Sequence, residues 1–102
     1  MSTEAKVSIA IDRAIDRLNE LLPAGQAVSR DPGTILLGRS GRLDSMAFVN
    51  FIVALDEEIE NQLGMKASMA DELGESGMGD LTIQEVHSAA VRLADRAHPD
   101  HD

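Results

Sequence analysis

Apolar residues recur at helical spacing in three stretches of the chain. The first stripe consists of Val7, Ile11, Ala14, Leu18 and Leu21, and it is widened by Ile15 and Leu22. Residues separated by three or four positions share one face of a helix, so the pattern predicts an amphipathic helix over residues 4–22. Ser2 and Thr3 are both suitable N-caps, and Pro23 with Gly25 ends the pattern.

The second stretch, residues 44–62, is the most apolar. One stripe contains Phe48, Ile52, Leu55 and Ile59, and Val49 with Val53 forms another beside it. A helix that is apolar over more than one face is expected to pack on several sides. Its second half carries Asp56, Glu57, Glu58 and Glu60, although the helix dipole favours acids near the start. Two interpretations stay open, namely a functional role and a solvated face.

A third helix is predicted from Leu81 to Ala97, in which Ile83, Val86, Ala90 and Leu93 share a stripe. Asp80 and Thr82 are candidate N-caps, and Thr82 with Glu85 fits a capping box. Residues 23–43 are predicted to form a long loop attached to the core through Ile35, Leu36 and Leu37. A short helical turn is expected at Ala70–Leu73. The prediction is one all-α domain over residues 1–102, with three main helices plus a short one, an ordered core at 4–97 and a flexible tail at 98–102.

Composition limits the possible functions. The chain has 102 residues and a net charge of -9, which argues against binding nucleic acid or anionic lipid. The acidic surface either favours basic protein partners or only keeps a small protein in solution. It lacks cysteine, which excludes disulfides, zinc–cysteine sites and thiol nucleophiles. No stretch approaches the ~18 apolar residues of a membrane span, and the N-terminus does not read as a signal peptide. We therefore expect a cytoplasmic protein without membrane insertion.

Catalytic and metal-binding patterns are missing from the sequence. No H-E-x-x-H, P-loop or G-x-S-x-G motif occurs, and His87 has no evident nucleophile near it in the sequence. His98 and His101 alternate with acids in the tail, which is a poor place for a metal site. We expect neither an enzyme nor a resident metal ion.

Asp44 and Ser45 join a glycine-bearing loop to the start of the apolar helix. By themselves they read as a helix cap, since both are N-cap types. A serine in this place also presents its hydroxyl on a fixed backbone. The helix N-terminus would stabilise the negative charge of a phosphodiester formed on that hydroxyl.

The run from Asp44 to Ile59, DSMAFVNFIVALDEEI, resembles the acyl carrier protein family. That family has Asp-Ser-Leu, or a close variant, at the start of its second helix, followed by an apolar run and an acidic ending. The resemblance is strongest over these residues and extends in outline over residues 4–97. It implies an acyl-carrier-protein-like helical bundle with a long loop between the first two helices.

The resemblance also implies a function and a set of site residues. A phosphopantetheinyl transferase would move 4'-phosphopantetheine from coenzyme A to Ser45. The thiol of this covalent arm would carry an acyl or aminoacyl group as a thioester to loading and cargo-processing enzymes. Asp44 and Met46 match flanking recognition residues, and Glu57 and Glu58 match acids that meet basic partners. We expect a monomer, because the arm must reach several enzymes.

Some residues depart from the family pattern. Met46 replaces leucine, Ala47 and Asn50 stand where many fatty-acid carriers have acids, and Arg39 and Arg42 add positive charge upstream. These departures favour a specialised carrier over a housekeeping fatty-acid member. The alternative function is a helical protein-interaction module without a prosthetic group, with Met46, Phe48 and Phe51 as its binding patch.

Overall fold

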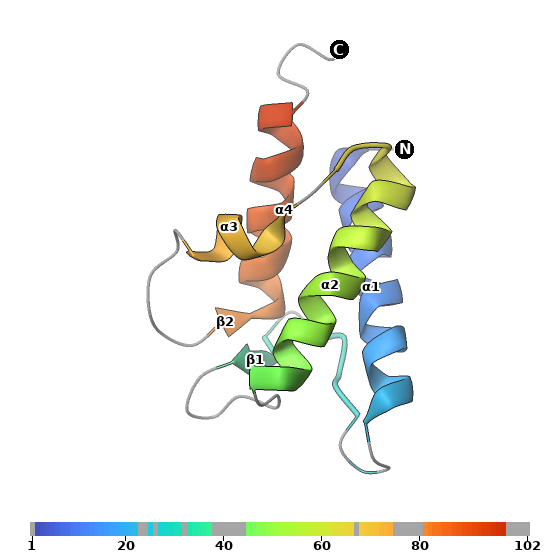
Figure 1. Cartoon of the computed structure of the whole chain (residues 1–102). Helices are drawn as coiled ribbons and strands as arrows, with labels where there is room; N and C mark the ends of the chain where they lie inside the picture. Colours follow the sequence, from blue (N-terminus) through green and yellow to red (C-terminus); the bar gives the residue numbers. More distant parts are fainter. Residues whose placement is uncertain are drawn as a thin grey trace.

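The computed structural model describes residues 2–22, 25, 27–31, 33–37, 45–66, 68–74 and 81–97. This part of the chain is mostly helical and contains a small sheet (Figure 1). Its elements are α1 (Thr3–Leu21), β1 (Ile35–Leu37), α2 (Ser45–Leu63), α3 (Met69–Gly74), β2 (Leu81–Thr82) and α4 (Ile83–Ala97). The predicted helical class is confirmed. Asp44 and the tail at 98–102 lie outside the described residues.

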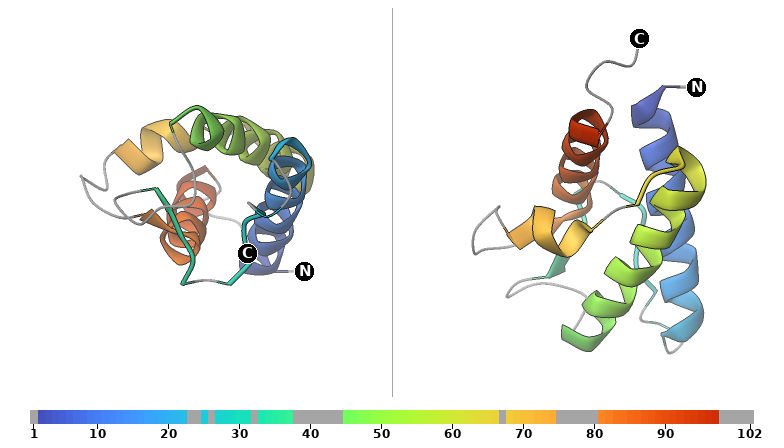
Figure 2. Two further views of the ribbon diagram at one scale, coloured as in Figure 1. Left: turned by 90° about the horizontal axis from the view of Figure 1, so that it is seen from below. Right: turned by 45° about the horizontal axis from the view of Figure 1, so that its top comes forward.

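The three long helices and α3 form a bundle around one core. The most extensive packing is between α1 and α2, which run side by side in opposite directions, whereas α4 packs against α1 and α3. Figure 2 shows from below how these helices surround the interior. As a result, α1 ends and α2 begins at the same end of the molecule, and α4 ends at the other.

Aliphatic side chains from every helix fill the core. Those of α1 are buried as the spacing predicted, except at the end of the helix, where Leu21 is exposed instead. Phe51 and Leu55 are fully buried on α2, but Val49 and Val53 lie exposed. The expectation that both stripes of α2 would be packed was therefore wrong, because no described element covers the side that carries the two valines.

The loop predicted between the first two helices contains a strand. β1 pairs antiparallel with β2, and Ile35 lies opposite Thr82 in the register. The sheet was not predicted because two such short strands show no alternating pattern. Leu36 is fully buried, which confirms that this segment is attached to the core.

A second attachment of the same segment is the backbone of Val28. The Asn19 side chain donates to the Val28 carbonyl (3.1 Å) and accepts from the Val28 amide (2.7 Å). The side-chain amide of Asn19 thus satisfies both the backbone N–H and the backbone C=O of the buried Val28.

The helix ends follow the predicted capping chemistry. The Ser2 hydroxyl accepts from the Ala5 amide (3.1 Å), so Ser2 is the N-cap of α1. At α4, the Glu85 amide donates to the Thr82 hydroxyl (3.2 Å), and the Thr82 amide donates to the Glu85 carboxylate (2.9 Å). This reciprocal pair is the expected capping box, and it makes α4 begin at Ile83 rather than at Leu81.

Candidate functional site

Ser45 is the first residue of α2. Its position at a helix N-terminus agrees with the sequence prediction. The end of α1 lies at the same end of the molecule (Figure 1). Asp44 and the glycine-bearing residues 38–43 lie outside the described residues.

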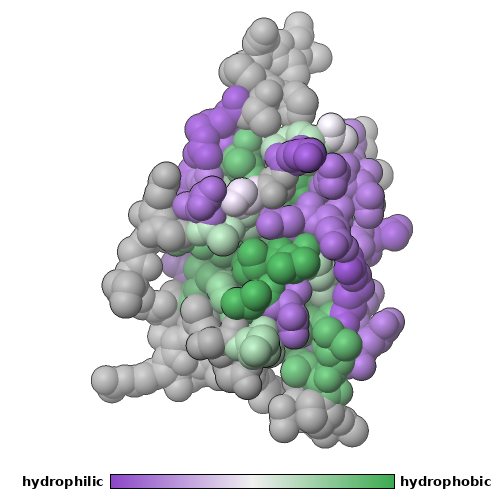
Figure 3. Space-filling view, viewed as in Figure 1, coloured by the Kyte–Doolittle hydropathy of each residue, from purple (hydrophilic) through white to green (hydrophobic). Residues whose placement is uncertain are grey.

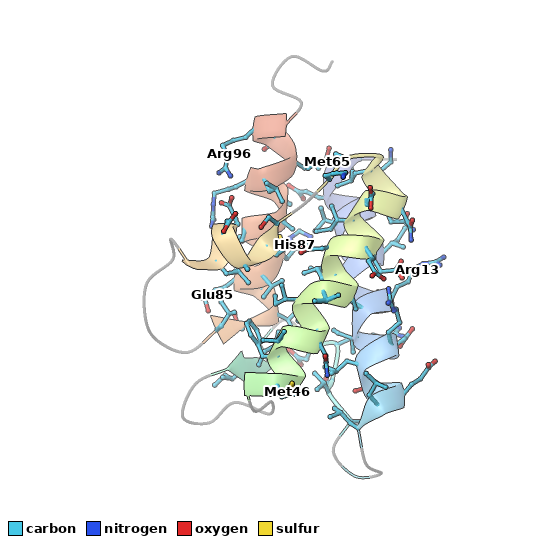
Figure 4. All side chains as sticks on the ribbon, in the orientation of Figure 1. Arg13, Met46, Met65, Glu85, His87 and Arg96 are labelled. Atoms are coloured by element: carbon cyan, nitrogen blue, oxygen red, sulfur yellow. The ribbon has the colours of Figure 1, made fainter. Side chains whose placement is uncertain are left out.

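An exposed apolar stripe runs along α2 away from Ser45. Met46 is 71% exposed, Val49 55% and Val53 51%. These residues are three and four positions apart, so they share one face of the helix. Figure 3 shows hydrophobic side chains gathered over α2, and Figure 4 places Met46 at the start of this helix. We call Met46, Val49 and Val53 the α2 stripe.

The phenylalanines lie on other sides of α2. Phe51 is fully buried, and Phe48 packs against the core with partial burial. Their ring centroids are 6.4 Å apart, within the range of a favourable aromatic pair. A binding patch made of Met46, Phe48 and Phe51 is therefore not present. Of these three residues, only Met46 is largely exposed.

A groove between α1 and α2 borders the α2 stripe. It has a volume of about 360 Å³ and is lined by Arg17, Leu18, Glu20, Leu21, Asn50, Val53 and Ala54. Leu21 is 69% exposed at the end of α1. We call this hollow the α1–α2 groove. It extends the apolar surface from α2 onto the neighbouring helix.

Glu57 and Glu58 face α1 and bind Arg17. Nη2 of Arg17 lies 2.7 Å from Oε1 of Glu57, and Nη1 lies 3.3 Å from Oε2 of Glu58. These contacts raise the pKa of Arg17, chiefly through the hydrogen bond to Glu57. Glu58 is buried and Glu57 remains exposed. Since a helix rises about 1.5 Å per residue, both acids lie about 18–20 Å along α2 from Ser45. The structure therefore does not bring them together with Ser45 and Met46.

Asp56, which precedes Glu57 on α2, contacts the first residue of α3. Oδ1 of Asp56 accepts a hydrogen bond of 2.9 Å from the Met69 amide. Burial raises the pKa of Asp56, although this hydrogen bond opposes the rise and the nearby Asp71 adds to it. Asp56 of α2 thus caps the start of the short helix α3.

Glu72 of α3 is a buried acid paired with two arginines of α4. Arg96 donates to both of its carboxylate oxygens, and Nε of Arg92 lies 3.5 Å from Oε2. The hydrogen bonds from Arg96 lower the pKa of Glu72. Sequence reasoning did not find this cluster, because its members come from separate helices.

The sequence did not indicate the partner of His87, which is partly buried. The Ser8 hydroxyl of α1 lies 3.1 Å from Nε2 of His87 on α4. Both residues line a hollow of about 350 Å³ between these helices, together with Asp12 and Arg30. Nε2 also lies 3.4 Å from the Glu4 carbonyl oxygen. The imidazole therefore links α4 to the first turns of α1.

Comparison with known protein families, curated proteins and solved structures found no match. None of the described helices combines the length and apolarity that crossing a bilayer requires. Within the described ranges, no three histidine, aspartate or glutamate side chains gather as ligands for a metal ion.

Proposed function

We propose that the chain is a carrier protein that holds its cargo on a 4'-phosphopantetheine arm attached to Ser45. The observation that carries the proposal is the position of Ser45 at the start of α2, directly beside an exposed apolar stripe. A modified serine needs a surface against which enzymes can dock, and the α2 stripe supplies one within the first three turns of α2.

Physical chemistry supports a phosphodiester at this helix end. The first amides of a helix lack intrahelical partners and carry a partial positive charge, which favours an anion attached there. α2 is also held firmly, since Phe51, Leu55 and Ile59 are buried in the core. An arm at Ser45 would thus start from a fixed base.

The cargo on this arm is an acyl or aminoacyl group bound as a thioester. The chain itself is not the enzyme. A phosphopantetheinyl transferase attaches the arm, and separate enzymes load and process the cargo in the cytoplasm. Ala47 and Asn50 follow Ser45 without a charge, which supports a specialised carrier. Weak loading by generic fatty-acid synthase enzymes would support that assignment, and efficient turnover would count against it.

The α2 stripe also favours a second function. A helical interaction module without a prosthetic group would bind a partner through Met46, Val49 and Val53, all of which are exposed. In that case Ser45 only begins a helix. The two functions differ in whether Ser45 is modified.

Intact-mass spectrometry separates them. The apo protein is incubated with coenzyme A, Mg²⁺ and a broad-specificity phosphopantetheinyl transferase. We expect the mass of one phosphopantetheine to be added to the wild type and none to Ser45→Ala. Circular dichroism should show that the variant is folded, because Ser45 is the first residue of α2 and even the loss of an N-cap costs only about 0.5–2 kcal/mol. No addition with several competent transferases would overturn the proposal.

A further inference from the structure

The α1–α2 groove lies toward the end of the molecule at which α1 ends and Ser45 begins α2 (Figure 1). We propose that the transferase that modifies Ser45 docks across both helices, with an apolar side chain in this groove and a cation beside Glu20. This inference rests on the proposed function and names a second element, α1, as part of the surface that the transferase recognises.

The apolar part of the argument comes from Leu21. It is the last residue of α1 and is 69% exposed. It lines the groove with Val53, which is also exposed, so aliphatic side chains border the groove on both helices. Figure 3 shows hydrophobic surface over α2 and again at the end of α1. An apolar side chain placed between the two helices would remove both residues from water, which favours association.

The charged residues that line the groove indicate which charged group of the transferase binds beside its apolar side chain. Arg17 is already bound to Glu57 and Glu58, so its charge is compensated within the protein. Glu20 lines the same groove, is exposed and forms no ion pair with any residue of the described ranges. Its charge is therefore available, and a lysine or arginine of the transferase is the complement.

Net charge argues for an enzyme rather than a second copy of this chain. Each copy carries a formal charge of -9, so two copies would repel each other as they approach. A second copy seated on the groove would also crowd the end of the molecule where Ser45 lies. A transferase must approach that end in any case, because Ser45 is its acceptor.

Steady-state transfer kinetics with a broad-specificity phosphopantetheinyl transferase, coenzyme A and Mg²⁺ test the docking surface. We expect Leu21→Ser to raise KM for the carrier roughly five- to tenfold, with kcat changed less than about twofold, as for an interface anchor. Leu21→Met should leave KM near the wild-type value, since it keeps an apolar side chain of similar size.

The charge is tested with a matched pair of variants on α1. Glu20→Gln should raise KM about two- to threefold and weaken its dependence on NaCl, because a charge at an interface acts mainly on encounter. Glu4→Gln, at the other end of the helix, should leave KM near the wild-type value.

The outcomes separate this inference from the proposed function. If the wild type is loaded but Leu21→Ser and Glu20→Gln keep the wild-type KM, the docking surface is wrong and the carrier function stands. If no transferase loads the wild type, both the carrier function and the docking surface are contradicted. A wild-type dimer in sedimentation velocity that Leu21→Ser abolishes would assign the groove to a second copy and overturn the inference.

Discussion

Nη2 of Arg17 on α1 lies 2.7 Å from Oε1 of Glu57 on α2. The same guanidinium reaches the buried Glu58, so one cation serves two adjacent acids of the neighbouring helix. Acids late in a helix are opposed by its dipole, and here a cation from outside the helix compensates them. The acidic ending of α2 therefore has a role inside the fold, whatever partners the protein binds.

Arg17→Met should destabilise the protein by about 1–3 kcal/mol, because it leaves the buried Glu58 without its cation. Urea denaturation measures the loss. The matched control is Arg13→Met on the same helix. Arg13 is exposed and lies on the outer side of α1 in Figure 4, so its replacement should have little effect. Equal stability of the two variants would contradict a structural role for the Arg17 contacts.

Asp56→Asn should stabilise the protein at neutral pH. Burial raises the pKa of Asp56, so the ionised carboxylate carries a cost in the folded state at every pH above that raised pKa. Asparagine keeps an oxygen for the Met69 amide and removes the cost. The gain should disappear as the pH falls below about 3.9, where the carboxyl is neutral in both states. Urea midpoints at pH 7 and pH 3.5 measure it, and a loss of stability at pH 7 would contradict it.

Glu72→Gln should destabilise the protein at neutral pH, in contrast to Asp56→Asn. The arginines lower the pKa of Glu72 in the folded protein, so its contribution is fully present above the unfolded value of about 4.3. That contribution is lost as the pH falls through the lowered pKa. We expect a loss of roughly 1–3 kcal/mol at pH 7 that shrinks on acidification.

The control for Glu72 is Glu60→Gln, which removes an exposed acid of α2. Its stability relative to the wild type should change little at any pH. If the two glutamine variants followed the same pH profile in urea denaturation, general charge reduction would explain the effect and the Glu72 cluster would not.

The two phenylalanines should differ in their cost of truncation. Phe51→Ala removes a fully buried ring and should cost about 3–5 kcal/mol. Phe48→Ala removes a partly buried ring and should cost clearly less. Thermal unfolding by calorimetry compares them. A larger effect at Phe48 would contradict the orientation of α2 in the bundle.

Periodicity predicted the long helices well, because residues such as Val7, Ile11 and Ala14 recur every three or four positions and so share one face of a helix. It failed at Leu21 and Val53, which continue apolar stripes but lie exposed. A stripe shows that residues share a face, and only the neighbouring elements decide whether that face is covered. The contacts of Arg17 with Glu57 and of Ser8 with His87 join residues far apart in sequence, and no local pattern indicates them.

From the local sequence alone, Ser45 reads as a helix cap, and the resemblance to carrier proteins is what makes it a candidate attachment site. The structure adds that α2 begins at this residue and that an exposed apolar stripe follows it. The acids that the sequence linked to partner binding lie farther along α2 and contact Arg17. These findings shift the expected recognition surface toward the α2 stripe and the groove beside it.

The most direct test of the carrier function locates the arm on the chain. Wild type, Ser45→Ala and the exposed-serine control Ser88→Ala are incubated with transferase and coenzyme A, and the modified peptide is sequenced by tandem mass spectrometry. We expect one phosphopantetheine in the peptide that contains Ser45, unchanged loading of Ser88→Ala and none of Ser45→Ala. An unmodified wild type, or an arm on any other residue, would contradict the account.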